Sequence, residues 1–133
     1  MGAAENKQLM QHIFAELLKG NAEPYIASLA DDIRWTLIGT TKFSGTFHGK
    51  QAVFKELLEP VLSQIAGSPT MMAHRFIAEG DYVVVECHGQ NTTTTAGKAY
   101  NNTYCCVYRI AEGKVHEVTE YLDTELVTAA FGR

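Results

Sequence analysis

The sequence lacks the features that would tie the protein to a membrane or to a nucleic acid. No apolar run approaches the roughly 20 residues that cross a bilayer, and the start, MGAAENKQLMQHIF, lacks the basic and apolar segments of a signal peptide. The net charge of −4 offers no basic surface for a nucleic acid. We therefore expect a cytoplasmic protein that binds neither membranes nor nucleic acids.

Cysteine is scarce, and common cofactor motifs are absent. Of the three cysteines, Cys105 and Cys106 are neighbours that would point to opposite faces of a strand, and no CxxC pair occurs. The sequence also has no P-loop, no HExxH, no GxSxG and no glycine-rich phosphate loop. We expect neither a metal nor a cofactor.

The 133 residues are enough for one domain, 1–133, with its own hydrophobic core. Apolar residues at helical spacing predict a helix over 5–19, a short helix over 25–30 and a third over about 50–65. Alternation predicts a strand over 31–39, followed by a glycine-containing loop over 40–49. Four further strands are predicted over 71–80, 81–95, 98–113 and 114–123, and a short helix over 124–133. Helices first and a meander last indicate an α+β fold.

Four segments carry a family resemblance that covers essentially the whole chain: LADDIRW, FSGTFHGKQAV, GKAYNNTYCCVYRIAEGKV and EYLDT. In this order they resemble the SnoaL-like branch of the nuclear transport factor 2-like superfamily, to which ketosteroid isomerase and limonene epoxide hydrolase are related. The resemblance implies a cone-shaped, strongly bent antiparallel sheet packed on three helices around a central pocket, the cystatin-like roll. It also implies pairing of two copies through the outer sheet face, so we expect a homodimer.

The resemblance also implies site residues. Glu120 falls at the inward catalytic aspartate of the epoxide hydrolase, and Trp35 at its water-positioning tyrosine. Asn102 falls at the protonated aspartate of ketosteroid isomerase. Neither reaction is inherited whole, because the other catalytic positions of those two enzymes read Cys87, Gly89, Leu37 and Ile13 in this chain.

Strand alternation gives a separate reason to place Glu120 inside. Val118 and Leu122 are apolar and share its face, which also takes in His116. A carboxyl group on an apolar wall has a raised pKa and can act as an acid or a base near neutrality. The alternative is a hydrogen bond between Glu120 and a structural partner, such as Tyr104, His116 or a loop amide.

The other candidate residues have a functional and a structural interpretation each. Asn102 would orient a substrate carbonyl or satisfy nearby backbone, and Trp35 and Tyr104 would form an aromatic wall or simply pack in the core. We predict Glu120 and Asn102 as catalytic residues. The predicted substrate-binding residues are Trp35, Leu37, Cys87, Tyr104, His116, Val118 and Leu122.

Three functions remain open at this point. The first is a cofactor-free acid–base enzyme of isomerase, cyclase, dehydratase or hydrolase type, acting on a small hydrophobic, polyketide-like or steroid-like molecule. The second is a non-catalytic carrier or sensor of such a molecule, and the third is a dimeric scaffold. A second polar group near Glu120 would favour the enzyme.

Overall fold

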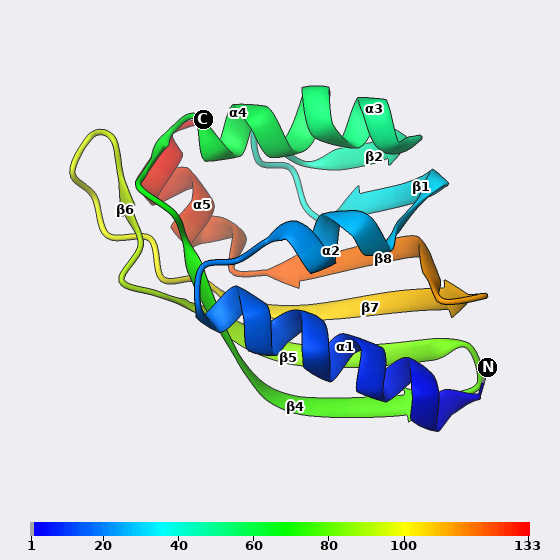
Figure 1. The fold of residues 1–133 in the computed structure, drawn as a ribbon. Coiled ribbons are helices and arrows are strands. Elements are labelled where there is room, and N and C mark those ends of the chain that lie inside the picture. The colour runs from blue at the N-terminus through cyan, green and yellow to red at the C-terminus, as the bar shows by residue number, and fades with distance from the viewer. Residues whose placement is uncertain (1) are drawn as a thin grey trace.

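The computed structural model describes residues 2–133 and shows an α+β fold (Figure 1). Helices come first, strands dominate the second half, and a short helix ends the chain. The helices are α1 (Ala3–Leu18), α2 (Glu23–Ser28), α3 (Lys50–Ala52), η1 (Val53–Leu58), α4 (Glu59–Leu62) and α5 (Thr124–Phe131). The strands are β1 (Leu29–Leu37), β2 (Gly45–His48), β3 (Ile65–Ala66), β4 (Thr70–Glu79), β5 (Tyr82–Gln90), β6 (Thr93–Thr94), β7 (Thr103–Ala111) and β8 (Lys114–Leu122).

Six strands form one curved sheet in the order β2-β1-β8-β7-β5-β4. Its neighbouring strands run antiparallel, except that β1 and β8 are parallel. Register shifts interrupt the pairs β4–β5, β7–β8 and β1–β8, and such bulges bend and twist a sheet. The predicted α+β fold with a bent, mainly antiparallel sheet is confirmed, and the parallel β1–β8 pair is a detail that the prediction lacked.

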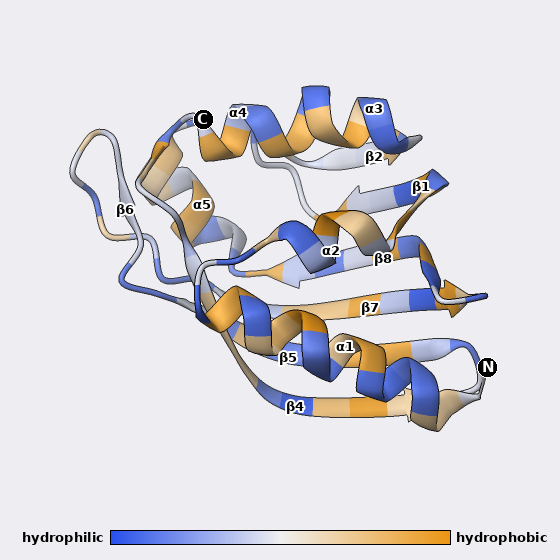
Figure 2. Cartoon of the chain, in the orientation of Figure 1, coloured by the Kyte–Doolittle hydropathy of each residue, from blue (hydrophilic) through white to orange (hydrophobic). Residues whose placement is uncertain are grey.

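Helix α1 covers β4 and β5 because its apolar residues recur on one side (Figures 1 and 2). Met10, Ile13 and Phe14 are buried, whereas most of the helix's polar side chains face outward. Gly20, with φ of +82°, follows the C-cap and lets the chain leave the helix. Among residues 2–133, none of the helices has the length and apolar character needed to span a bilayer.

The predicted helix over 50–65 ends at Leu62 and is not regular. Its middle, η1, is a π-helix that lies just before Pro60. Proline has no N–H to donate and its ring crowds the carbonyl four residues earlier, here that of Glu56. A wider turn relieves that crowding. Leu57 and Leu58 of this segment both lie against the interior.

Two loops contain strands that the sequence interpretation placed differently. β2 lies inside the segment predicted as a loop and pairs with β1 at the sheet edge. The threonine run was predicted to continue the long β5–β7 hairpin, but only Thr93 and Thr94 form a strand, and it pairs with β3 in a separate two-stranded sheet. β7 consequently begins at Thr103 rather than at Lys98.

Candidate functional site

A cavity of about 450 Å³ lies between the inner face of the curved sheet and the helices. Its wall contains residues of the helices α1, α2, η1, α4 and α5, of the sheet, and of the segment just before β4. Almost all of the wall is apolar. The side chains that provide its aromatic and polar groups are Phe14, Tyr25, Trp35, Phe43, Tyr100, Tyr104, Tyr108, Glu120 and Phe131, with Ser68 and Thr70 near the start of β4.

Among residues 2–133, Glu120 contributes the only carboxyl group to this wall. It lies on β8 between Leu37 of β1 and Cys106 of β7, its partners in the strand register. The Trp35 indole Nε1–H donates a hydrogen bond of 3.0 Å to Glu120 Oε1. Trp35 and Glu120 therefore lie on the same face of the sheet, as alternation along β1 and β8 predicts.

The environment of Glu120 raises its pKa to about 7. Burial in the apolar wall is the main cause, because it disfavours the charged form, and the Trp35 hydrogen bond opposes it by stabilising the carboxylate. Glu120 nevertheless keeps part of its surface accessible, and it borders the cavity. At pH 7 the protonated and the ionised form of Glu120 are therefore both populated.

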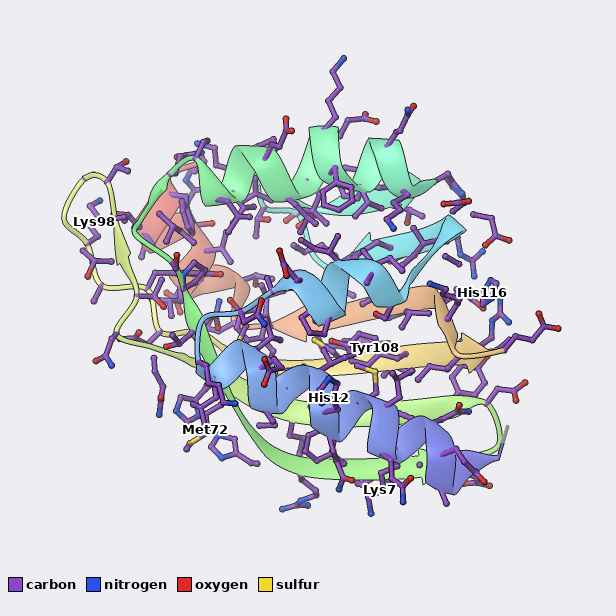
Figure 3. All side chains as sticks on the ribbon, viewed as in Figure 1. Lys7, His12, Met72, Lys98, Tyr108 and His116 are labelled. Atoms are coloured by element: carbon purple, nitrogen blue, oxygen red, sulfur yellow. The ribbon has the colours of Figure 1, made fainter. Side chains whose placement is uncertain are left out.

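Four tyrosine hydroxyls supply further polar groups of the wall. The hydroxyls of Tyr25 and Tyr108 are hydrogen-bonded at 2.8 Å, and Tyr108 lies on β7 below α2 (Figure 3). The Tyr104 hydroxyl donates to the Tyr100 hydroxyl at 3.4 Å. Burial raises the pKa of all four phenols above the ordinary value of 10. They remain protonated at neutral pH and can donate hydrogen bonds.

Asn102 does not face the cavity, contrary to the sequence interpretation. Its side chain is fully buried and makes four hydrogen bonds, to the backbone N–H groups of Thr103 and Asp123, the Asp123 carbonyl and the Tyr100 hydroxyl. These bonds satisfy the donors and acceptors of the amide. Asn102 therefore joins the start of β7 to the end of β8 and cannot itself contact a molecule in the cavity.

Replacing Asn102 should destabilise the fold. In Asn102→Ala, two backbone N–H groups and one carbonyl lose their partner, and the expected loss is about 2 kcal/mol in the free energy of unfolding. The measurement is urea denaturation. The matched control is Asn101→Ala, which removes one backbone hydrogen bond, to Thr92, from an exposed neighbour. An equal, small loss in both variants would contradict the structural role of Asn102.

His116 and Val118 also differ from their predicted positions. A bulge lies where the β7–β8 register shifts between Arg109 and Ile110, and it breaks the alternation at His116. His116 instead bonds Asp32 at 3.0 Å, near the start of β8 (Figure 3). Val118 does face inward, but it is buried in the core beside Trp35 and does not border the cavity.

The remaining predicted site residues border the cavity: Trp35, Leu37, Cys87, Tyr104, Glu120 and Leu122. Sequence reasoning missed Tyr25, Tyr100, Tyr108 and the apolar residues of the helices. The buried face of α1 gave a signal for Phe14, since it repeats with helical spacing. The sequence has no such periodic signal for Tyr25, which lies on the short helix α2, or for Tyr100, which lies in a loop.

The thiols of Cys87 and Cys106 are part of the same wall. A hydrogen bond with Cys87 and burial raise the pKa of the Cys106 thiol well above its ordinary value, so it stays protonated. Within residues 2–133, no three His, Cys, Asp or Glu side chains come together as a metal site would require.

Comparison with known proteins adds a family and a set of similar structures. A family model described as a SnoaL-like domain matches residues 10–118. The match ends two residues before Glu120. No curated protein matches the chain.

Three solved structures illustrate the structural similarity. An NTF2-like protein of unknown function from Burkholderia pseudomallei is 22% identical, with a TM-score of 0.80 over 96% of this chain and 98% of that one. A Bacillus subtilis protein provisionally named an isomerase is 18% identical, with a TM-score of 0.79 over 99% and 96%. A Jannaschia protein provisionally named a SnoaL-like polyketide cyclase is 15% identical, with a TM-score of 0.74 over 98% and 93%. At these identities the similarity shows the fold alone.

Proposed function

The chain belongs to the SnoaL-like domain family, and from that membership and its buried carboxyl group we propose that it is an acid–base enzyme acting on a small, largely apolar molecule. One observation carries the proposal. Glu120 lies in an apolar cavity with a pKa of about 7, whereas an exposed glutamate would be ionised at that pH. A general acid or base works best when its pKa lies near the operating pH.

The ionised Glu120 would take a proton from a substrate, and the neutral form would return it at another atom. The Trp35 indole holds one carboxylate oxygen in place and stabilises the negative charge between these two steps. Isomerisation, cyclisation, dehydration and hydrolysis all include such a transfer. They differ in which bond then forms or breaks in the substrate.

The cavity supports a substrate of moderate size with a flat apolar body. Its wall is rich in aromatic rings, and its polar groups are Glu120 and a few hydroxyls. Two similar structures bear the provisional names isomerase and SnoaL-like polyketide cyclase, which favours cyclic ketones and polyketide-like compounds as the first to test.

Proton transfer can be tested without knowing the substrate. A panel of aromatic and polycyclic ketones is incubated with the protein in deuterated water, and mass spectrometry follows deuterium entering the carbon next to the carbonyl. Exchange above the protein-free rate supports the proposal. Binding of panel members without exchange of any of them would count against an enzyme.

That last result would favour a second function, a carrier or sensor of the same class of molecule. The observation in its favour is that, in the part of the chain that the structure describes, the cavity wall contains no histidine, lysine or arginine. Of the described residues of the wall, Glu120 is therefore the only acidic or basic side chain, and its pKa is about 7. A carrier needs only the apolar wall and one polar contact to orient its ligand.

We also propose that the protein is a homodimer that pairs through the outer sheet face. The positions that motivate this are Thr103, Cys105, Val107, Thr119 and Tyr121, and Tyr121 is 47% exposed. Charges near them are neutralised locally, since Glu117 pairs with both Arg34 and Arg109. Light scattering at micromolar concentration should give twice the chain mass of 14.7 kDa, and Tyr121→Lys should shift the equilibrium toward the monomer. A wild-type protein that stays monomeric would contradict the proposal.

A further inference from the structure

The orientation of the Asn102 amide is fixed by its surroundings. Its oxygen accepts from two backbone N–H groups, those of Thr103 at 2.7 Å and Asp123 at 3.2 Å. A flipped amide would place its NH₂ group against these two donors, so the flip is excluded. The nitrogen must then donate, and it does so to the Asp123 carbonyl at 3.0 Å and to the Tyr100 hydroxyl at 3.1 Å.

This fixed donor determines what the Tyr100 hydroxyl can do. An amide N–H never accepts, so the Tyr100 oxygen is the acceptor in that bond. The Tyr104 hydroxyl also donates to it, at 3.4 Å. A hydroxyl oxygen has two lone pairs, and both are now used. The proton of Tyr100 must therefore find an acceptor elsewhere, and no hydrogen bond that it donates is found among residues 2–133.

Tyr100 borders the cavity, and its ring is held by Phe131, with ring centres 4.7 Å apart. We infer that Tyr100 is a ligand-recognition residue that donates its proton to an oxygen of the bound molecule, such as a carbonyl or an enolate oxygen. Asn102 and Tyr104 are positioning residues that act through it. The inference rests on the proposed function in using the same cavity, and it narrows the substrate to compounds with an acceptor oxygen on an apolar body.

Two other groups could donate to a ligand oxygen and must be separated from Tyr100. The hydroxyls of Tyr25 and Tyr108 share one hydrogen bond, so one of their two protons stays available. Glu120 can donate while it is protonated. At pH 8.5 the carboxyl group is mostly ionised and no longer donates, which leaves the tyrosines to be compared by substitution.

The experiment uses two probes of similar shape, 2-acetylnaphthalene and 2-ethylnaphthalene, at pH 8.5. Calorimetry gives their affinities for the wild-type protein, Tyr100→Phe and the control Tyr108→Phe, and infrared difference spectra give the carbonyl stretch of the bound ketone. Tyr100→Phe removes only the hydroxyl and leaves the ring that packs on Phe131. We expect Tyr100→Phe to weaken the binding of the ketone roughly 3- to 10-fold, as for loss of one neutral hydrogen bond. The affinity for the hydrocarbon should stay unchanged.

The carbonyl stretch of the bound ketone should lie at lower wavenumber in the wild-type protein and in Tyr108→Phe, and should return toward its value in hydrocarbon solvent in Tyr100→Phe. If the Tyr100 hydroxyl had a structural role alone, Tyr100→Phe would weaken the binding of both probes equally. The inference would be overturned if Tyr100→Phe lowered the affinities for the two probes equally. It would also be overturned if the carbonyl stretch of the bound ketone were unshifted in the wild-type protein, or if its shift were lost only in Tyr108→Phe. Absence of binding of both probes would overturn it too. The proposed function is judged separately, by deuterium exchange, and stands if exchange persists in Tyr100→Phe.

Discussion

Glu120→Gln is expected to lower the rate of proton transfer by on the order of 10²-fold or more, with the fold intact. Glutamine keeps the length of the side chain and an oxygen that can accept the Trp35 indole hydrogen bond, which is 3.0 Å long with glutamate. Glutamine cannot take up or release a proton near neutral pH. The readout is the rate of deuterium exchange in the ketone that the wild-type protein exchanges fastest, with thermal unfolding recorded beside it.

A matched control for this variant lies on the same strand. Glu117 is also a carboxyl group of β8, but it is paired with Arg34 and Arg109 on the outer face. Glu117→Gln should leave the exchange rate within about twofold of wild type, since a group outside the cavity transfers no proton there. Unchanged exchange in Glu120→Gln would remove Glu120 from the mechanism, whatever the control does.

The position of Glu120 was predictable because β8 is regular around it. From Glu117 to Leu122 the register with β7 runs without interruption. Because alternate residues of a strand share a face, Glu120 and Leu122 face inward together with Val118. The same argument failed four residues earlier, at His116, because a bulge lies there. A bulge depends on the pairing of two strands, and the sequence of one strand does not reveal it.

Asn102 shows a different limit of strand alternation. The sequence interpretation extended the strand over 98–113 and placed Asn102, Tyr104 and Cys106 on one face. β7 begins only at Thr103, so alternation holds for Tyr104 and Cys106 and has no meaning for Asn102. What decides its orientation is the pair of backbone N–H groups around it, one of which comes from Asp123 beyond the next strand.

The helical side of the cavity was the part that sequence patterns described least. Apolar spacing predicted α1 and a helix over about 50–65, but not which residues reach the interior across from Glu120. The π-helical segment η1 changes the side-chain directions that regular α-helical spacing would give. Leu57 and Leu58 of this segment both border the cavity.

The stability of the protein should fall as the pH rises from about 5 to 8, and Glu120 should be the reason. The pKa of Glu120 is about 7 in the folded protein and 4.5 in the absence of these surroundings. Between these values the folded state binds more protons than the unfolded state, so the free energy of unfolding decreases with increasing pH. A difference of about 2.5 in pKa corresponds to roughly 3 kcal/mol as an upper limit, since Glu120 keeps some accessible surface.

Substitution isolates this contribution from that of other titrating groups. Glu120→Gln cannot ionise, so its curve of unfolding free energy against pH should lack the decrease, and its advantage over wild type should grow from pH 5 to pH 8. Glu120→Leu should behave in the same way if the carboxyl group serves function alone.

Glu117→Gln is the control, because the pKa of Glu117 is shifted in the opposite direction from that of Glu120. Its pairing with Arg109 and Arg34 lowers the pKa of Glu117, so that contribution is lost only at acidic pH and its curve should run parallel to wild type above pH 5. Urea denaturation at pH 5, 6, 7 and 8 gives the four curves, and parallel curves for wild type and Glu120→Gln would show that the folded protein does not hold a proton on Glu120.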